Sequence, residues 1–199
     1  MIEAKEIAKR YGDKTVFEHL SLTVESGVWT VLTGASGLGK TTLLRVLAGL
    51  EQPDEGVVSG LDGLRKSFVF QENRLLERAS ALENILCVAP DRERAMKMLE
   101  LVGLGTELSK PAGKLSGGMK RRLAIARALA YGGDVFFLDE PLRELDKGTE
   151  TQIASLLRGE LQGKTVLLIT HDEDFANQPG NTVLRFVGPP MRLEQKELS

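Results

Sequence analysis

The 199-residue sequence has one cysteine, no long apolar run and no excess of one charge, and each absence excludes a class of protein. The lone Cys87 rules out an internal disulfide. Because Cys87 lies in the apolar run 85–89, we expect a buried thiol with a structural role. A membrane-spanning helix needs about 20 apolar residues, and this run of five is the longest in the chain. The N-terminus has no apolar block typical of a secretory signal, so we expect a cytoplasmic protein.

Charge and composition exclude further classes of protein. Lys and Arg number 26 against 28 Asp and Glu, which gives a net charge of -2. A dedicated nucleic-acid binder would usually be clearly basic, so we expect no nucleic-acid partner. The hydrophobic share of 42% and the charged share of 27% are typical of a globular protein that buries its own core. At about 150 residues per domain, the length predicts a single domain over 1–199.

Apolar patterning predicts an α/β chain. Strands are predicted at 2–8, 15–24, 28–33, 67–70, 135–138 and 166–169. Helices are predicted at 42–50, 116–131 and 149–161. The turn residues 11–14 favour a hairpin, and the four-residue apolar runs near 135 and 166 are typical of strands buried in a parallel sheet. Between 74 and 110 apolar residues recur at helical spacing, which predicts an inserted helical lobe. The composition of 51–63 favours loops or edge strands. The last ten residues, 190–199, are polar and are expected to be loosely held.

A glycine-rich segment over 34–42 reads GASGLGKTT and matches the pattern G-x-x-x-x-G-K-[ST] of a P-loop. It stands between a predicted strand and a predicted helix, which argues against an accidental glycine-rich turn. Glycines let backbone N–H groups curl around phosphate oxygens, and the helix N-terminus favours the same anion. Lys40 is expected to reach the β- and γ-phosphates, and Thr41 to offer its hydroxyl to Mg²⁺. The predicted nucleotide-binding residues here are Ser36, Gly37, Leu38, Gly39, Lys40, Thr41 and Thr42.

Two carboxylates follow the apolar strand predicted over 135–138. In an open α/β sheet, ligands gather at the carboxyl ends of the strands, which places Asp139 beside the P-loop. Asp139 is then a partner for Mg²⁺, and Glu140 is placed to polarise the attacking water as a general base. The alternative is that both carboxylates are solvated turn residues.

Residues 115–129, which read LSGGMKRRLAIARAL, resemble the signature motif and helix of the ATP-binding cassette (ABC) family. With the P-loop and Asp139-Glu140, the resemblance covers about residues 2–186. Ser116 suits a helix N-cap, and Gly117 and Gly118 leave the first N–H groups bare, as in an anion-binding helix end. In the family, this end closes on the γ-phosphate held by a partner subunit. The resemblance therefore implies a homodimer or pseudo-dimer that sandwiches two ATP molecules.

The resemblance also implies roles for single residues. Tyr11 matches the aromatic ring that stacks on adenine, although a tyrosine in a hairpin turn is the alternative. Gln71 matches the glutamine that touches Mg²⁺ and the attacking water, and a plain surface glutamine is its alternative. His171 matches the switch histidine that contacts the γ-phosphate, where a structural histidine is the alternative. Asp146 matches the aspartate of the loop that crosses the dimer.

This sequence departs from the family beside that aspartate. Members of the family usually carry small residues where this chain has Arg143 and Glu144. These charged side chains would either form ion pairs across the dimer or hinder close approach, and the sequence leaves both outcomes open. Met119, in place of the commoner glutamine, fits the subgroup of bacterial importers for nitrate, sulfonate and taurine, as does the stretch 70–76.

The resemblance implies a P-loop NTPase core with a mostly parallel sheet flanked by helices and an N-terminal antiparallel β subdomain. The core would comprise 1–73 and 132–190, and 74–131 would form a small helical subdomain with the signature helix. The implied function is an ATPase subunit of an ABC transporter, an importer of a small solute, on the inner face of the cell membrane beside a permease. A cassette ATPase in cofactor assembly and a nucleotide-dependent switch are the alternatives. The sequence does not identify the solute.

Overall fold

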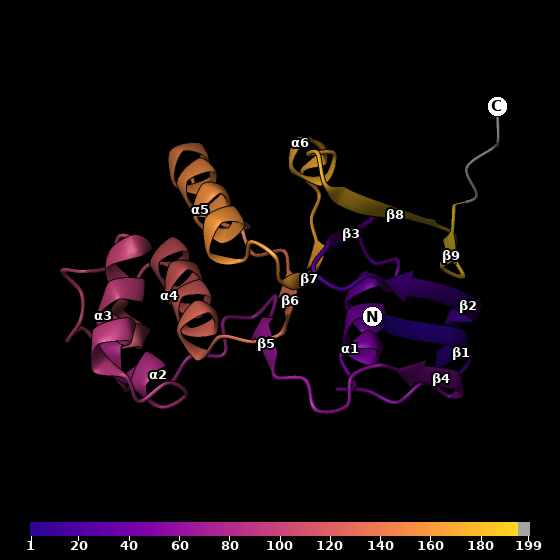
Figure 1. The fold of residues 1–199 in the computed structure, drawn as a ribbon, viewed down its shortest axis with the longest axis horizontal. Helices are drawn as coiled ribbons and strands as arrows, with labels where there is room; N and C mark the ends of the chain where they lie inside the picture. Colours follow the sequence, from indigo (N-terminus) through magenta and orange to yellow (C-terminus); the bar gives the residue numbers. More distant parts are fainter. Residues whose placement is uncertain (195–199) are drawn as a thin grey trace. The chain divides into compact units, whose positions relative to one another are not determined.

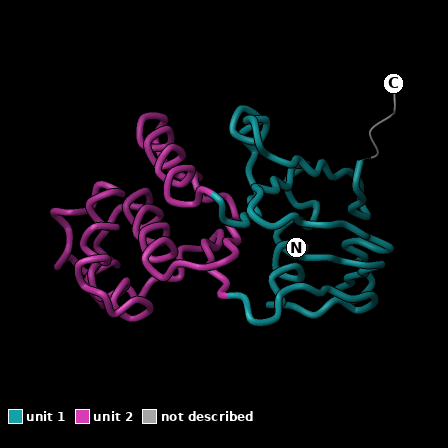
Figure 2. The backbone as a smooth tube through the Cα atoms, in the orientation of Figure 1, with its two compact units in different colours: residues 1–64, 163–199 teal, residues 65–162 magenta. Residues whose placement is uncertain are grey.

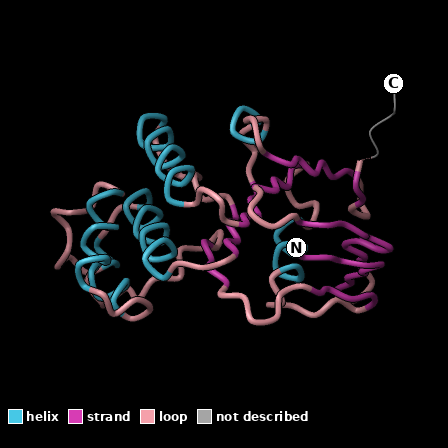
Figure 3. Tube along the Cα trace, in the orientation of Figure 1, coloured by secondary structure: helices cyan, strands magenta, loops and turns pink. Residues whose placement is uncertain are grey.

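Strands and helices of the chain gather into two compact units (Figures 1 and 2). The computed structural model describes residues 1–194. Unit 1 comprises 1–64 and 163–199, and unit 2 comprises 65–162. Strands dominate unit 1 and helices dominate unit 2 (Figure 3).

Unit 1 contains an antiparallel sheet built from the N-terminal hairpin. Strand β1 (Ile2–Tyr11) pairs with β2 (Lys14–Val24) on one side and with β4 (Glu55–Ser59) on the other. Tyr11 pairs with Lys14 across the turn, which confirms the predicted hairpin. Strand β4 lies within the stretch for which loops or edge strands were predicted.

The other strands of unit 1 are mostly parallel. Strand β3 (Trp29–Thr33) pairs in parallel with β7 (Thr165–Ile169) and with β8 (Asn181–Val187). Helix α1 (Lys40–Leu47) packs near β7, and the short α6 (Glu173–Ala176) follows that strand. Every residue of β7 is buried, as predicted from its apolar run. Parallel pairing brings the loops after β3 and β7 to the same edge.

Unit 2 joins a parallel strand pair to a helical cluster. Strand β5 (Lys66–Val69) pairs in parallel with β6 (Val135–Asp139), whose five residues are all buried. The cluster consists of α2 (Ala81–Leu86), α3 (Arg92–Leu101) and α4 (Gly117–Tyr131), which contact one another, and α4 also contacts β5. The 3-10 turn Ala112–Lys114 precedes α4, and α5 (Lys147–Glu160) follows β6. The predicted α/β class with an inserted helical lobe is confirmed.

Several helices and strands begin or end at residues other than those predicted. Helix α1 begins at Lys40, because Gly39 ends the loop, and stops at Leu47 before a glycine turn. Helix α5 begins at Lys147, because Asp146 caps it. Residues 192–193 form β9 (Arg192–Leu193) against β8, so the expectation of a loose end is wrong there, and 195–199 lie outside the described residues.

Two expectations for the helical lobe are wrong. Cys87 is exposed, because it ends α2 and lies beyond its buried face, and its Sγ donates a hydrogen bond to the Asn84 carbonyl at 3.3 Å. Residues 74–80 contain no helix where helical spacing was predicted: 74–76 are irregular, 77–79 form a turn and a bend, and Ser80 forms a bridge with Pro111. Ser80 and Glu83 form a capping box that begins α2 only at Ala81.

The turn before α2 is held by a buried amide. Asn84 is fully buried, and its Oδ1 accepts from the Leu76 backbone N–H at 2.8 Å. Its Nδ2 donates to the carbonyls of Leu76, Ala79 and Ser80 at 3.0, 3.3 and 3.0 Å. One side chain therefore supplies hydrogen-bond partners for backbone groups of a segment that forms no helix.

We predict that Asn84→Ala destabilises the protein by about 1–3 kcal/mol, because buried backbone groups lose their partners. The exposed Asn177→Ala serves as the control, with an expected change within about 0.5 kcal/mol. Denaturant unfolding measures both free energies. Equal losses in the two variants would contradict the role given to Asn84.

Candidate nucleotide-binding site

The glycine-rich loop connects β3 to α1, which is the strand, loop and helix context predicted for 34–42. Lys40 is 5% exposed, and its Nζ donates to the carbonyls of Gly34 and Ala35, both at 2.8 Å. The ammonium therefore lies over the loop, next to the N-terminus of α1. A cation and a helix N-terminus at one place favour an anion such as phosphate.

Glycine is required where the loop meets the helix. Gly39 has φ +110°, and a Cβ added there would lie 2.3 Å from Val16 Cγ1. Ser36 and Gly37 are exposed, whereas the side chain of Leu38 is buried, so a contribution of Leu38 to a ligand would come from its backbone. Thr41 and Thr42 are half-buried in the first turn of α1.

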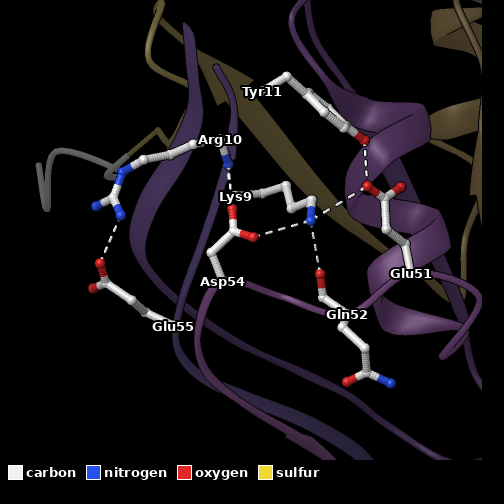
Figure 4. Close-up of polar contacts among 7 residues, drawn as sticks. All are labelled: Lys9, Arg10, Tyr11, Glu51, Gln52, Asp54 and Glu55. Carbon is white, nitrogen blue, oxygen red and sulfur yellow. Dashed lines mark hydrogen bonds and ion pairs between the residues drawn. The ribbon is translucent and has the colours of Figure 1, made fainter. Parts of the chain in front are cut away.

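Tyr11 ends β1, and other residues of unit 1 hold its ring (Figure 4). Its hydroxyl donates to the Glu51 carboxylate, and the Lys9 ammonium lies 5.5 Å from the centroid of the ring. Desolvation and the bond to Glu51 raise the pKa of Tyr11, and the nearby Thr42 hydroxyl opposes this. Tyr11 as a whole residue is still 49% exposed, so a flat partner has access to it.

Lys9 connects the Tyr11 strand to the segment that follows α1. Its Nζ donates to the Gln52 carbonyl at 2.9 Å, and lies 3.2 Å from Asp54 Oδ1 and 3.4 Å from Glu51 Oε1 (Figure 4). The Asp54 carboxylate also accepts the backbone N–H of Arg10 at 2.6 Å. That N–H and the Lys9 ammonium lower the pKa of Asp54.

His171 follows β7 and lines a pocket of about 220 Å³ together with Gly34, the first residue of the predicted P-loop. Thr33, Asp172 and Arg185 line the same pocket. The parallel register pairs Leu32 with Ile169, so the two loops begin at the same edge. Within unit 1, the structure therefore brings His171 into one pocket with Gly34, the first residue of the P-loop.

In unit 2, Asp139 ends β6, and Glu140 follows it directly. Asp139 is 3% exposed, and Glu140 has φ +49°, a left-handed conformation that is uncommon for a residue with a side chain. A Glu140 carboxylate oxygen lies 3.2 Å from Arg143 Nη1. Arg143, which departs from the family pattern, thus forms an ion pair within its own chain.

The glycines of the signature segment lie at the beginning of α4. Ser116 caps this helix, and its Oγ accepts from the Met119 N–H at 3.3 Å, which confirms the predicted N-cap. Glu144 lies close: a Cβ added at Gly117 would be 3.4 Å from its Oε2, and one at Gly118 would be 3.3 Å from its carbonyl oxygen. The second residue that departs from the family pattern therefore packs beside the signature glycines of the same chain.

Asp146 caps α5. Its Oδ1 accepts from the Thr149 N–H at 3.0 Å, and its Oδ2 accepts from the Thr149 hydroxyl at 2.7 Å. These bonds lower the pKa of Asp146. Gln71 is exposed two residues after β5, and its carbonyl accepts from Arg121 Nη1 at 3.3 Å.

The predicted site residues divide between the units. Unit 1 holds the P-loop, Tyr11 and His171, and unit 2 holds Gln71, the signature segment, Asp139, Glu140 and Asp146. Sequence reasoning missed three residues that hold these groups, namely Lys9, Glu51 and Arg121, whereas Arg143 was expected to pair across a dimer or to hinder its close approach and instead pairs with Glu140 of its own chain. The helix Gly117–Tyr131 carries four cations, three of them consecutive, so nothing in the sequence singles out Arg121, and nothing in the linear order pairs Lys9 with Glu51.

The sequence pattern described as "ABC transporter" matches residues 17–143. The chain therefore belongs to the ABC transporter family. Its fold is that of an ABC ATPase cassette: the ATP-binding cassette MJ0796, in a dimeric post-hydrolysis state with ADP and phosphate, superposes with a TM-score of 0.87 at 28% identity, over 98% of this chain and 97% of that one.

Two relatives are ATP-binding proteins of importers. The aliphatic sulfonates import protein SsuB 1 of Rhodococcus jostii is 46% identical over 85% of this chain and 72% of its own length. The Fe(3+) ions import protein FbpC of Brucella melitensis is 38% identical over 90% of this chain and 56% of its own length. No helix within residues 1–194 has the length and apolar character needed to cross a membrane.

We predict that Asp54→Asn lowers stability at neutral pH but not in acid. The folded-state pKa of Asp54 is lowered, so its contribution is present above the unfolded pKa of about 4 and is lost as the pH falls through the folded pKa. Denaturant midpoints between about pH 7 and about pH 2 measure the difference from the wild type, which should shrink as the pH falls. The exposed Asp62→Asn is the control, and a difference that persisted in acid would refute the assignment.

Proposed function

We propose that the chain is the ATP-binding and hydrolysing subunit of an ABC importer for a small solute. The observation that carries this proposal is the presence, in one ABC-family chain, of a P-loop covered by Lys40 and of a second glycine-rich helix N-terminus, which Ser116 caps. The residues 1–199 would act as one ATPase domain, whose helical part within 74–131 faces the permease.

ATP would be held by unit 1. Backbone N–H groups of 36–42 would surround the phosphates, and Lys40 would contact the β- and γ-phosphates. Tyr11 would stack on adenine, since its exposed ring is held by Glu51 and Lys9.

The oxygen donors of the chain fit Mg²⁺, which prefers hydroxyl and carboxylate oxygens. Thr41 offers a hydroxyl in the first turn of α1, and Asp139 offers a buried carboxylate at the end of β6. We infer that Thr41, Asp139 and Gln71 hold the ion, directly or through water. When bound, Mg²⁺ would supply positive charge beside the phosphate oxygens.

Hydrolysis would depend on Glu140 as the general base that accepts a proton from the attacking water. Gln71 would orient that water, and His171 would contact the γ-phosphate. Lys40 would stabilise the charge of the transferring group without moving, because its partners already hold it over the loop.

Dimer closure would couple hydrolysis to transport. Ser116, Gly117 and Gly118 would present their helix end to the γ-phosphate bound by a second copy, and Asp146 would lie in the loop that crosses the dimer. Loss of the γ-phosphate would remove that attraction and open the dimer. To shift the dimer from 1:99 to 99:1 in favour of the closed state, ATP must bind the closed state about 5.5 kcal/mol more tightly than the open state.

The importer assignment is supported by the names of the relatives. A membrane permease would bind the helical part of unit 2 and place the subunit on the inner face of the membrane. Co-purification of a permease supports this assignment, whereas recovery with a cofactor-assembly complex would favour the alternative ATPase role.

The function is tested by Glu140→Gln. We expect loss of phosphate release and accumulation of an ATP-bound dimer, because the amide cannot accept the proton. Steady-state phosphate assays and size-exclusion chromatography with ATP measure both effects. The exposed Glu160→Gln carries the same substitution on α5 and should hydrolyse ATP like the wild type. Unchanged phosphate release in Glu140→Gln would remove the general-base assignment.

The adenine assignment is tested by Tyr11→Ala. We expect ATP affinity to fall by about 1–3 kcal/mol, the usual worth of base stacking on an aromatic ring. Inorganic tripolyphosphate should bind as it does to the wild type, because the P-loop is intact. The only other tyrosine, Tyr131, provides the matched control Tyr131→Ala. Equal losses for ATP and tripolyphosphate would count against stacking.

A further inference from the structure

Arg121 is the largest fully buried side chain within residues 1–194. It lies in the second turn of α4, five residues after the cap Ser116, and is 2% exposed. Burial lowers the pKa of its guanidinium, and the charges of Asp139, Glu144 and Glu140 oppose that effect. A buried cation is costly unless its donors are satisfied, so the partners of Arg121 should explain its position.

The guanidinium donates to two separate loops. Nη1 donates to the carbonyls of Phe70 at 2.5 Å and Gln71 at 3.3 Å, and to Asn73 Oδ1 at 3.3 Å. On the other side, three carbonyls accept. Nη2 donates to Asp139 at 2.7 Å and to Glu140, and Nε donates to Pro141 at 3.0 Å.

These two loops follow neighbouring strands. Strands β5 and β6 are parallel, and Val69 pairs with Leu138, so their carboxyl ends lie side by side. One planar fork of fixed geometry spans both loop backbones. The loops carry Gln71 and Glu140. In the proposed function, Gln71 orients the attacking water and Glu140 accepts its proton.

We propose that Arg121 is a positioning residue for hydrolysis, which fixes the backbones of Gln71 and Glu140 relative to each other. This inference rests on the proposed function. Glu140 has φ +49°, and Arg121 binds its carbonyl and those of both neighbours, so the fork holds a turn that is uncommon for glutamate. A general base must lie within hydrogen-bond reach of its water, and small displacements reduce the rate strongly.

Arg122 provides a matched control on the same helix. Its Nη1 also donates to two backbone carbonyls, those of Val102 at 2.7 Å and Gly103 at 3.0 Å. These carbonyls follow α3 in the helical cluster, and no role in hydrolysis is given to them. A loss of fold stability should therefore affect both arginine variants, whereas a loss of positioning should affect only Arg121.

The test compares Arg121→Gln, Arg121→Lys and Arg122→Gln in the full chain with the wild type. Turnover and KM for ATP, affinity for a fluorescent ATP analogue, the thermal midpoint and amide hydrogen exchange are measured for each. We expect kcat to fall by about tenfold to a hundredfold in Arg121→Gln, with KM and affinity within about threefold. Arg121→Lys, which keeps the charge but not the fork, should lie between Arg121→Gln and the wild type.

Hydrogen exchange separates positioning from general stability. Protection should fall at 70–73 and 139–140 in Arg121→Gln, and at 102–104 in Arg122→Gln, whose kcat should match that of the wild type. The inference is overturned if Arg121→Gln keeps wild-type kcat, if both arginines lower kcat equally, or if both Arg121 variants fail to fold while Arg122→Gln folds. A wild-type chain that does not hydrolyse ATP would instead remove the proposed function itself.

Discussion

Parallel pairing of buried strands is the constraint on which the candidate site depends. Strands that run side by side in one direction end at a common edge, so the loops that follow them are neighbours. In unit 1, β3 and β7 bring Gly34 and His171 to one pocket. In unit 2, β5 and β6 bring the backbones of Gln71 and Glu140 within reach of one guanidinium. The apolar strands supply the stability, and their polar ends supply the chemistry.

Long polar side chains hold several of the loops and turns of the two units. Lys9 and Glu51 hold the Tyr11 ring (Figure 4). Lys40 lies over the P-loop, and Arg121 spans two loops. Asn84 does the same for the turn before α2. In each case the donors and acceptors are satisfied by main-chain or charged groups, which makes burial of a polar side chain tolerable.

The two residues that depart from the family pattern make contacts within their own chain. Arg143 pairs with Glu140, and Glu144 packs beside the signature glycines, where the family usually has small residues. Both contacts involve groups to which hydrolysis or dimer closure is assigned. The two charged residues therefore lie beside the proposed general base and beside the N-terminus of α4.

The sequence by itself determined the class of fold, because the periodicity of buried strands and the glycine, lysine and carboxylate patterns are local properties of the chain. It also predicted the P-loop context and the Ser116 cap, since both depend on neighbours in sequence. Only the tertiary structure decided the contacts of Arg121 and Lys9, the non-helical path of 74–80 and the exposure of Cys87. Those outcomes depend on groups that are far apart in sequence, or on which side of a short helix faces the core, and linear spacing does not specify either.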